Sequence, residues 1–109
     1  MFYHSCGGIT DILEDLIDIG VDILDPLQFN AMQLTPRQLA DKCGPRLAFH
    51  GGLDTQDLLV HATPDRVRQE IQCLKRELGR HGKYILSGSH FLQPDVPLPN
   101  IEAVVAETC

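Results

Sequence analysis

Residues 46–54 read RLAFHGGLD, and residues 63–79, a short polar connection later, read TPDRVRQEIQCLKRELG. The first stretch is a short apolar run that ends in glycines and a carboxylate, the pattern of a strand that opens into a turn. The second begins with a helix-start pair and carries apolar residues at helical spacing before a final glycine: Thr63, Pro64, Val67, Ile71, Leu74, Leu78 and Gly79. Together they predict one strand followed by one helix.

The same succession of strand, polar turn and helix occurs four times along the chain. We expect strands at residues 1–3, 21–24, 46–50 and 83–86, and helices at about 9–19, 35–44, 63–79 and from near 99 to 109. This alternation predicts parallel βαβ units of the α/β class within one domain, residues 1–109. A small open sheet and half of a (β/α)8 barrel of the TIM type both fit; the strand ends carry no G-x-G-x-x-G and no P-loop, which speaks against an open nucleotide-binding sheet.

Composition and charge exclude several classes of function. Nine basic against 15 acidic residues give a net charge of −6, the opposite of a nucleic-acid binder. The apolar runs are far shorter than the ~20 residues of a membrane helix, and nothing at the N-terminus resembles a secretory signal. Four cysteines without a C-x-x-C pair indicate a reducing compartment. We therefore expect a cytoplasmic protein with no nucleic-acid or membrane partner.

His4, Ser5 and Cys6 end the first expected strand, and they form the strongest candidate for a metal site. In an extended segment residues two apart point to the same side, so an imidazole and a thiolate can converge on one zinc ion. His90 ends the fourth expected strand, and in a barrel such ends face a common pocket. Three ligands with an open fourth position would be a catalytic zinc site; the alternative is an incidental His and Cys at a strand end.

Two carboxylates, Asp25 and Asp54, also follow expected strands. Either could contact a substrate or orient a ligand histidine, and turn formation is the alternative for Asp25, which precedes Pro26. We expect the remaining histidines to be structural: His50 packed within a strand, and His61 and His81 in surface loops.

Four blocks of the sequence resemble the uroporphyrinogen decarboxylase superfamily, and the resemblance extends over essentially the whole chain. They are residues 4–8, 20–28, 49–56 and 89–97, in this order and with helices between them. The resemblance implies a (β/α)8 barrel, of which this chain is similar to the last four βα units. The chain opens in a strand and closes in a helix, so we expect a C-terminal fragment whose first half lies elsewhere.

The superfamily has two main branches, and the sequence has features of each. Decarboxylases remove carboxyl groups from tetrapyrrole acetate arms without a cofactor and share a late His-x-x-x-Pro-Asp, which residues 89–95 resemble with His90 in the histidine place. Methyltransferases use zinc to move a methyl group between a corrinoid protein and a thiol, and their His-x-Cys resembles His4 and Cys6. Where they usually have a distal cysteine, this chain has His90.

The resemblance to the methyltransferase branch gives our main expectation. It implies zinc held by His4, Cys6 and His90, and a corrinoid carried by a partner protein. His90 and Asp54 are the expected catalytic residues, and the expected substrate-binding residues are Gly51, Gly52, Asp54 and Gln93.

Two alternatives stay open beside it. In a decarboxylase, His90 would contact the tetrapyrrole and the His4–Cys6 pair would be incidental. A non-catalytic half barrel would serve only in binding or assembly. In each case we expect the missing N-terminal half, or a second copy, to close the barrel, because a half barrel exposes unpaired strand edges. Alone, the chain should be poorly soluble and inactive.

Overall fold

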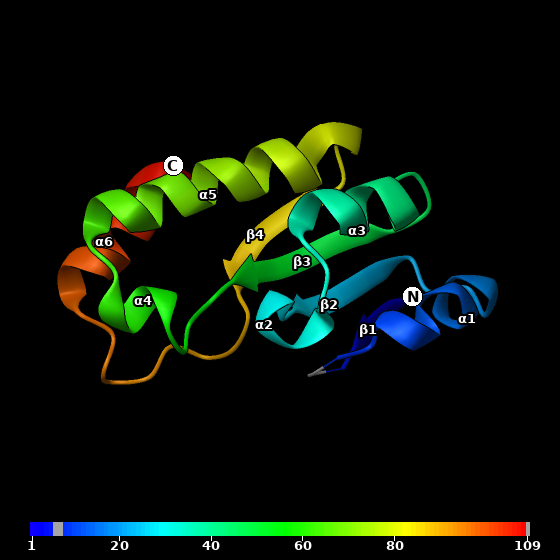
Figure 1. The fold of residues 1–109 in the computed structure, drawn as a ribbon, viewed down its shortest axis with the longest axis horizontal. Helices are drawn as coiled ribbons and strands as arrows, with labels where there is room; N and C mark the ends of the chain where they lie inside the picture. Colours follow the sequence, from blue (N-terminus) through cyan, green and yellow to red (C-terminus); the bar gives the residue numbers. More distant parts are fainter. Residues whose placement is uncertain (6–7, 109) are drawn as a thin grey trace.

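The computed structural model describes residues 1–5 and 8–108 (Figure 1). Its strands are β1 (Phe2–His4), β2 (Ile23–Leu27), β3 (Ala48–Leu53) and β4 (Tyr84–Gly88). Its helices are α1 (Leu13–Asp18), α2 (Phe29–Met32), α3 (Pro36–Cys43), α4 (Leu58–His61), α5 (Pro64–Leu78) and α6 (Leu98–Thr108), with 3-10 turns η1 (Thr10–Ile12) and η2 (Gly79–His81). None of the helices in these residues is long and apolar enough to cross a membrane.

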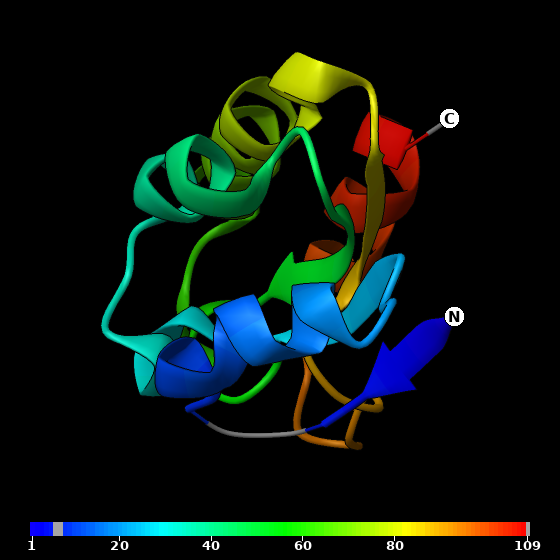
Figure 2. The same ribbon diagram turned by 90° about the vertical axis from the view of Figure 1, so that its right-hand side faces the viewer.

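The strands form one parallel sheet in the order β1-β2-β3-β4, so each strand pairs with its neighbour in the chain. Each strand is followed by helix, and α1, α3 and α5 lie on the same side of the sheet (Figure 2). Parallel strands in chain order with the helices outside are the arrangement of half a TIM-type barrel. The α/β class and the half-barrel architecture expected from the sequence are thus confirmed.

The core lies between the sheet and the helices. Leu24 and Phe49 project from the strands into it, and the apolar stripe of α5 meets them; its four members are each at most 1% exposed, namely Val67, Ile71, Leu74 and Leu78. The opposite face of the sheet is the inside of a barrel and is open here. Phe2 and Ile85 lie on it with 54% and 51% of their surface exposed.

Capping residues begin the two most regular helices at the positions expected. The Thr35 side chain accepts from the amide of Gln38, whose own side chain bonds back to the Thr35 amide, and Thr63 accepts from the amide of Arg66. In each case a proline follows as the first helical residue.

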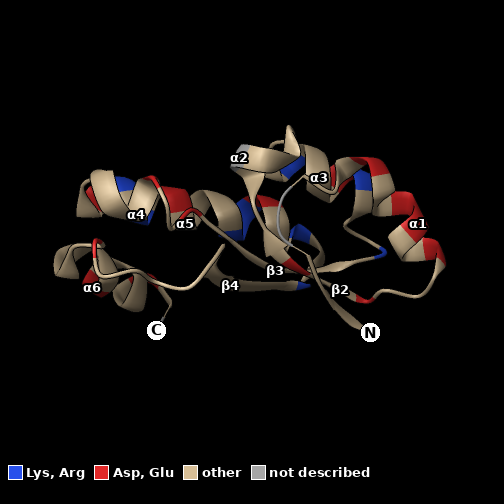
Figure 3. Ribbon diagram, turned by 90° about the horizontal axis from the view of Figure 1, so that it is seen from below, with Lys and Arg blue, Asp and Glu red and all other residues tan. Residues whose placement is uncertain are grey.

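Several element bounds differ from those expected. The helix expected at 9–19 divides into η1 and α1, whose acidic outer face is visible in Figure 3. The turn expected at Asp25 and Pro26 is instead part of β2, with a cis peptide bond between them and a register shift against β3. The short helices α2 and α4 lie in segments that we expected to be loops. The sequence does not reveal them, because one turn of helix has too few residues to show a hydrophobic period.

Candidate functional site

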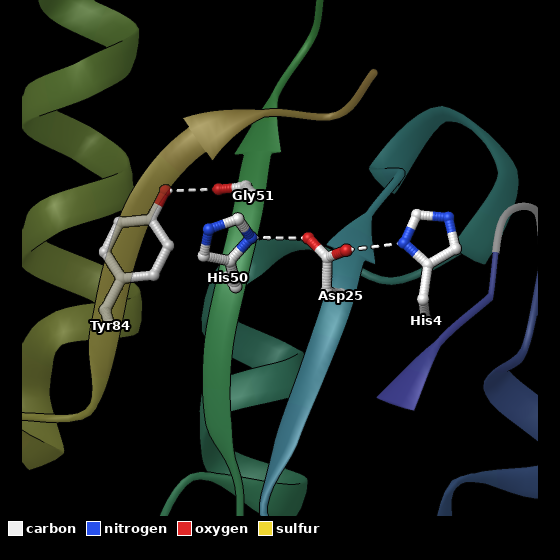
Figure 4. Close-up of polar contacts among 5 residues, drawn as sticks. All are labelled: His4, Asp25, His50, Gly51 and Tyr84. Carbon is white, nitrogen blue, oxygen red and sulfur yellow. Dashed lines mark hydrogen bonds and ion pairs between the residues drawn. The ribbon is translucent and has the colours of Figure 1, made fainter. Parts of the chain in front are cut away.

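The carboxylate of Asp25 lies between two imidazoles (Figure 4). One oxygen is 2.6 Å from Nδ1 of His4, and the other is hydrogen-bonded to Nδ1 of His50. The Asp25 side chain is 11% exposed, that of His50 27% and that of His4 64%. A nearly buried carboxylate is therefore satisfied by two ring nitrogens from the strands on either side of it.

Strand register brings the three side chains together. His4 pairs with Asp25 in the β1–β2 ladder, and paired residues of parallel strands face the same side of the sheet. The amide of Ser5 donates to the carbonyl of Asp25 at 2.8 Å, which fixes the end of β1. On β3, the neighbours of His50 in the alternation, Phe49 and Gly51, are buried, so His50 projects to the inner face with Asp25.

Gly51 allows the close approach of β2 and β3 at this point. Its φ is +107°, and a Cβ there would lie 3.0 Å from the amide nitrogen of Leu27. Its carbonyl accepts a hydrogen bond of 2.6 Å from the hydroxyl of Tyr84. Burial, with a smaller effect from the Glu70 carboxylate, raises the pKa of Tyr84 far above its ordinary value. The hydroxyl therefore stays a donor and holds β4 to β3.

A cavity of about 300 Å³ opens over the pair of imidazoles. It is lined by His4, Asp25, Pro26 and His50 and by residues 87–91 of the β4 end, which include His90. The ends of the first and fourth strands thus face one space, as the barrel argument requires. Cys6, the third expected zinc ligand, lies outside the described residues. Within residues 1–5 and 8–108, no group of three His, Cys, Asp or Glu side chains is close enough to hold a metal ion.

The other expected pocket residues lie around neighbouring cavities. Asp54 accepts from the amides of Gln56 and Asp57 at 2.9 and 3.1 Å, and with Gly52 it lines a cavity of about 270 Å³. Gln93 lines a third cavity together with His90. Asp54 therefore has a turn-forming role in this structure, and it does not line the cavity that holds His4.

Sequence reasoning missed His50, which we expected to be a packed strand residue. The structure corrects this: its ring is bonded to Asp25 and borders the cavity. The signal was present in the alternation of residues 47–50, because Leu47 and Phe49 belong to the core and their neighbours must face the other way. Turn formation was the alternative weighed for Asp25, and the structure instead places this residue in β2, in contact with two histidines.

Parallel strands in chain order on a half barrel define a class of fold, the TIM-type α/β barrels, whose active sites lie at the carboxyl ends of the strands, where these polar side chains are found. Within this class the comparisons point to one family. The profile described as "Uroporphyrinogen decarboxylase (URO-D)" matches residues 1–108. The chain belongs to that family.

Two curated relatives that are similar to this chain are both named uroporphyrinogen decarboxylase. The uroporphyrinogen decarboxylase of Magnetococcus marinus is 26% identical over 98 residues, which are 90% of this chain and 26% of that protein. The uroporphyrinogen decarboxylase of Pseudoalteromonas translucida is 29% identical over 59 residues, 54% of this chain and 16% of that protein. The chain spans about a quarter of the length of the first relative.

Proposed function

We propose that this chain forms one half of the pocket of a decarboxylase that acts on a carboxylated tetrapyrrole. The observation that carries the proposal is the cavity lined by His4, His50 and His90, in which Asp25 bonds to the first two. The family and the names of both relatives support it. This reverses the order of our expectations from the sequence, in which methyl transfer came first.

The chemistry needs two things that imidazoles supply. Loss of carbon dioxide breaks a bond between carbon and the carboxyl group, and the carbon left behind must receive a proton. An imidazole can hold that proton near neutral pH, and imidazolium groups can bind the remaining carboxylates through charge-assisted hydrogen bonds. We assign His90 to contact with the tetrapyrrole, since it is exposed at the mouth of the cavity.

Turnover requires the rest of the barrel. The inner face exposes Phe2 and Ile85, and in the described residues β1 and β4 each have one paired neighbour. We propose that the N-terminal half of the family barrel, or a second copy of this chain, covers this face. Binding is therefore the property to measure on the chain alone.

The test uses uroporphyrin, a stable carboxylated tetrapyrrole, in the presence of EDTA. Its fluorescence should change on titration with the folded chain, and His90→Gln should weaken binding by about tenfold, since a hydrogen bond to a charged group contributes about 1.5–3 kcal/mol. His61→Gln, on the exposed surface of α4, is the matched control and should bind as the parent does. Equal binding by both variants, or none by the folded parent, refutes the proposal.

One observation favours a second candidate, zinc-dependent methyl transfer from a corrinoid protein to a thiol. Nδ1 of His4 lies 2.6 Å from the Asp25 carboxylate, and a carboxylate is the partner that metal-ligating histidines typically have. The donor set of His4, Cys6 and His90 fits zinc in ligand type. A zinc ion held there would lower the pKa of a substrate thiol and supply a thiolate nucleophile. Asp25 would orient His4, and the open cavity would admit the methyl carrier.

Zinc content separates the two candidates. Elemental analysis of the purified chain should give about one zinc per chain if the second candidate holds, with loss in Cys6→Ser and retention in Cys73→Ser, a half-buried cysteine of α5. A folded, zinc-free chain that binds uroporphyrin supports the decarboxylase. A folded chain that binds neither supports the third alternative, a non-catalytic half barrel.

A further inference from the structure

We propose that Asp25 is a positioning residue that holds His4 and His50 in the same tautomer, with the proton on Nδ1 and the lone pair on Nε2. The assignment rests on the proposed function and is compatible with both candidates, since a lone pair on Nε2 can bind zinc and, once protonated, becomes an N–H donor for a carboxylate. It concerns the arrangement of three side chains and can be tested without substrate, metal or the rest of the barrel.

The hydrogen-bonding capacity of the groups leads to this assignment. An ionised carboxylate only accepts, and a neutral imidazole has one N–H and one acceptor nitrogen. Each oxygen of Asp25 meets an Nδ1, one from His4 and one from His50. Both Nδ1 atoms must therefore carry the proton when the rings are neutral, and both Nε2 atoms are acceptors. Figure 4 shows the second nitrogen of each ring turned away from the carboxylate.

The surroundings hold this arrangement in place. Asp25 is nearly buried within β2, and the backbone bond from Ser5 ties β1 to it at the same point. The ring of Phe2 contacts that of His50 edge-on, with centroids 5.6 Å apart, and limits its rotation. His90 borders the same cavity from the β4 end, where its ring contacts Phe91 instead.

The consequence is a pair of matched acceptor nitrogens on neighbouring strands. In the absence of a fixed acceptor, a neutral histidine can carry its proton on either nitrogen. One carboxylate that fixes two rings removes this freedom from both and holds them in the same tautomer. While the rings are neutral, a group that binds either Nε2 must be a donor or a metal ion; once a ring is protonated, its Nε2–H can donate to a carboxylate.

Long-range 1H–15N spectra of the 15N-histidine-labelled chain test the assignment directly, because the two ring nitrogens have different shifts in each tautomer. The spectra are recorded over a series of rising pH values until both rings show the nitrogen shifts of neutral imidazole. His4→Gln and His50→Gln assign the signals. Both rings should be in the Nδ1–H form; the Nε2–H form in either one overturns the proposal.

Asp25→Asn then tests whether the carboxylate is the cause. The amide that replaces it has one acceptor oxygen and one donor nitrogen, so only one ring can keep a proton on Nδ1. The other should convert to the Nε2–H form, while His61 keeps its parental spectrum. Two unchanged rings would overturn the causal part of the proposal. If the variant does not fold, the parental spectrum still decides the tautomers.

Discussion

Replacing Gly51 with alanine should destabilise the chain more than the same change at Gly20. Both glycines have a φ that side chains rarely adopt, +107° at Gly51 and +98° at Gly20. Alanine should cost about 1–3 kcal/mol for this reason at either position. At Gly51 the new Cβ would also lie 3.0 Å from the amide nitrogen of Leu27 and 3.3 Å from Cα of Pro26, whereas at Gly20 it would meet nothing within 4 Å.

Crowding against backbone atoms adds about 1–3 kcal/mol at Gly51 alone, because β2 must shift to relieve it. Urea unfolding followed by circular dichroism gives the free energy of unfolding of both variants and of the parent chain. A difference of 1 kcal/mol moves the midpoint of thermal unfolding by about 4–8 °C in a domain of this size, so thermal scans should separate the two variants clearly.

The comparison refutes the reasoning if the two variants unfold at the same midpoint, since the close approach of β2 and β3 would then carry no energetic weight. A larger loss at Gly20 would refute it as well. Either result would also remove the role given to Gly51 in the close approach of β2 and β3 beside Asp25 and His50.

Three further outcomes follow from individual contacts. Arg46 donates to both oxygens of Glu14 at 2.8 Å and lowers the pKa of that carboxyl. The ion pair therefore stabilises the chain above the unfolded-state pKa of Glu14, and this contribution is lost as the pH falls through the folded-state pKa. NMR titration should show a higher Glu14 pKa in Arg46→Gln. Burial raises the pKa of Tyr84, so its phenolate should appear only as the chain unfolds in alkali, and ultraviolet titration of Tyr84→Phe should lack that late step. Thr63→Ala removes the cap of α5 and should lower the free energy of unfolding by about 1 kcal/mol in urea titrations, with most of it restored in Thr63→Ser; an unchanged midpoint in the alanine variant would contradict the cap assignment.

The sequence predicts the helices and strands well where their pattern is long. The stripe of α5 repeats over about three turns between a cap and a glycine, so the bounds of this helix follow from local chemistry alone. The bounds of β2 do not, because Asp25 and Pro26 are typical turn residues. They stay in the sheet because Asp25 pairs with His4 of β1, and because Leu24 and Leu27 on either side of them pair with β3. Tertiary pairing overrode local preference there.

The sequence likewise predicts one part of the candidate site and misses another. The shared position of His4 and His90 follows from topology, since equivalent strand ends of a barrel face one pocket. The contact of His50 with Asp25 depends on the register between two strands, and a register shift next to it is not visible in the composition of either strand. The sequence therefore predicts which strand ends face one pocket, but it does not predict which side-chain atoms are in contact there.

The two imidazoles that share Asp25 belong to parts of the sheet with different resistance to local opening. His50 lies in β3, which has strands on both sides and buried residues along most of its length, whereas His4 ends β1, a three-residue strand with no fully buried member. Short, exposed strands open at a small fraction of the global unfolding free energy. Amide hydrogen exchange should therefore be faster at Ser5 than at Gly51. Only a fraction of the molecules then has both imidazoles bonded to Asp25 at any moment. That fraction depends on how often β1 detaches while the rest of the sheet stays folded.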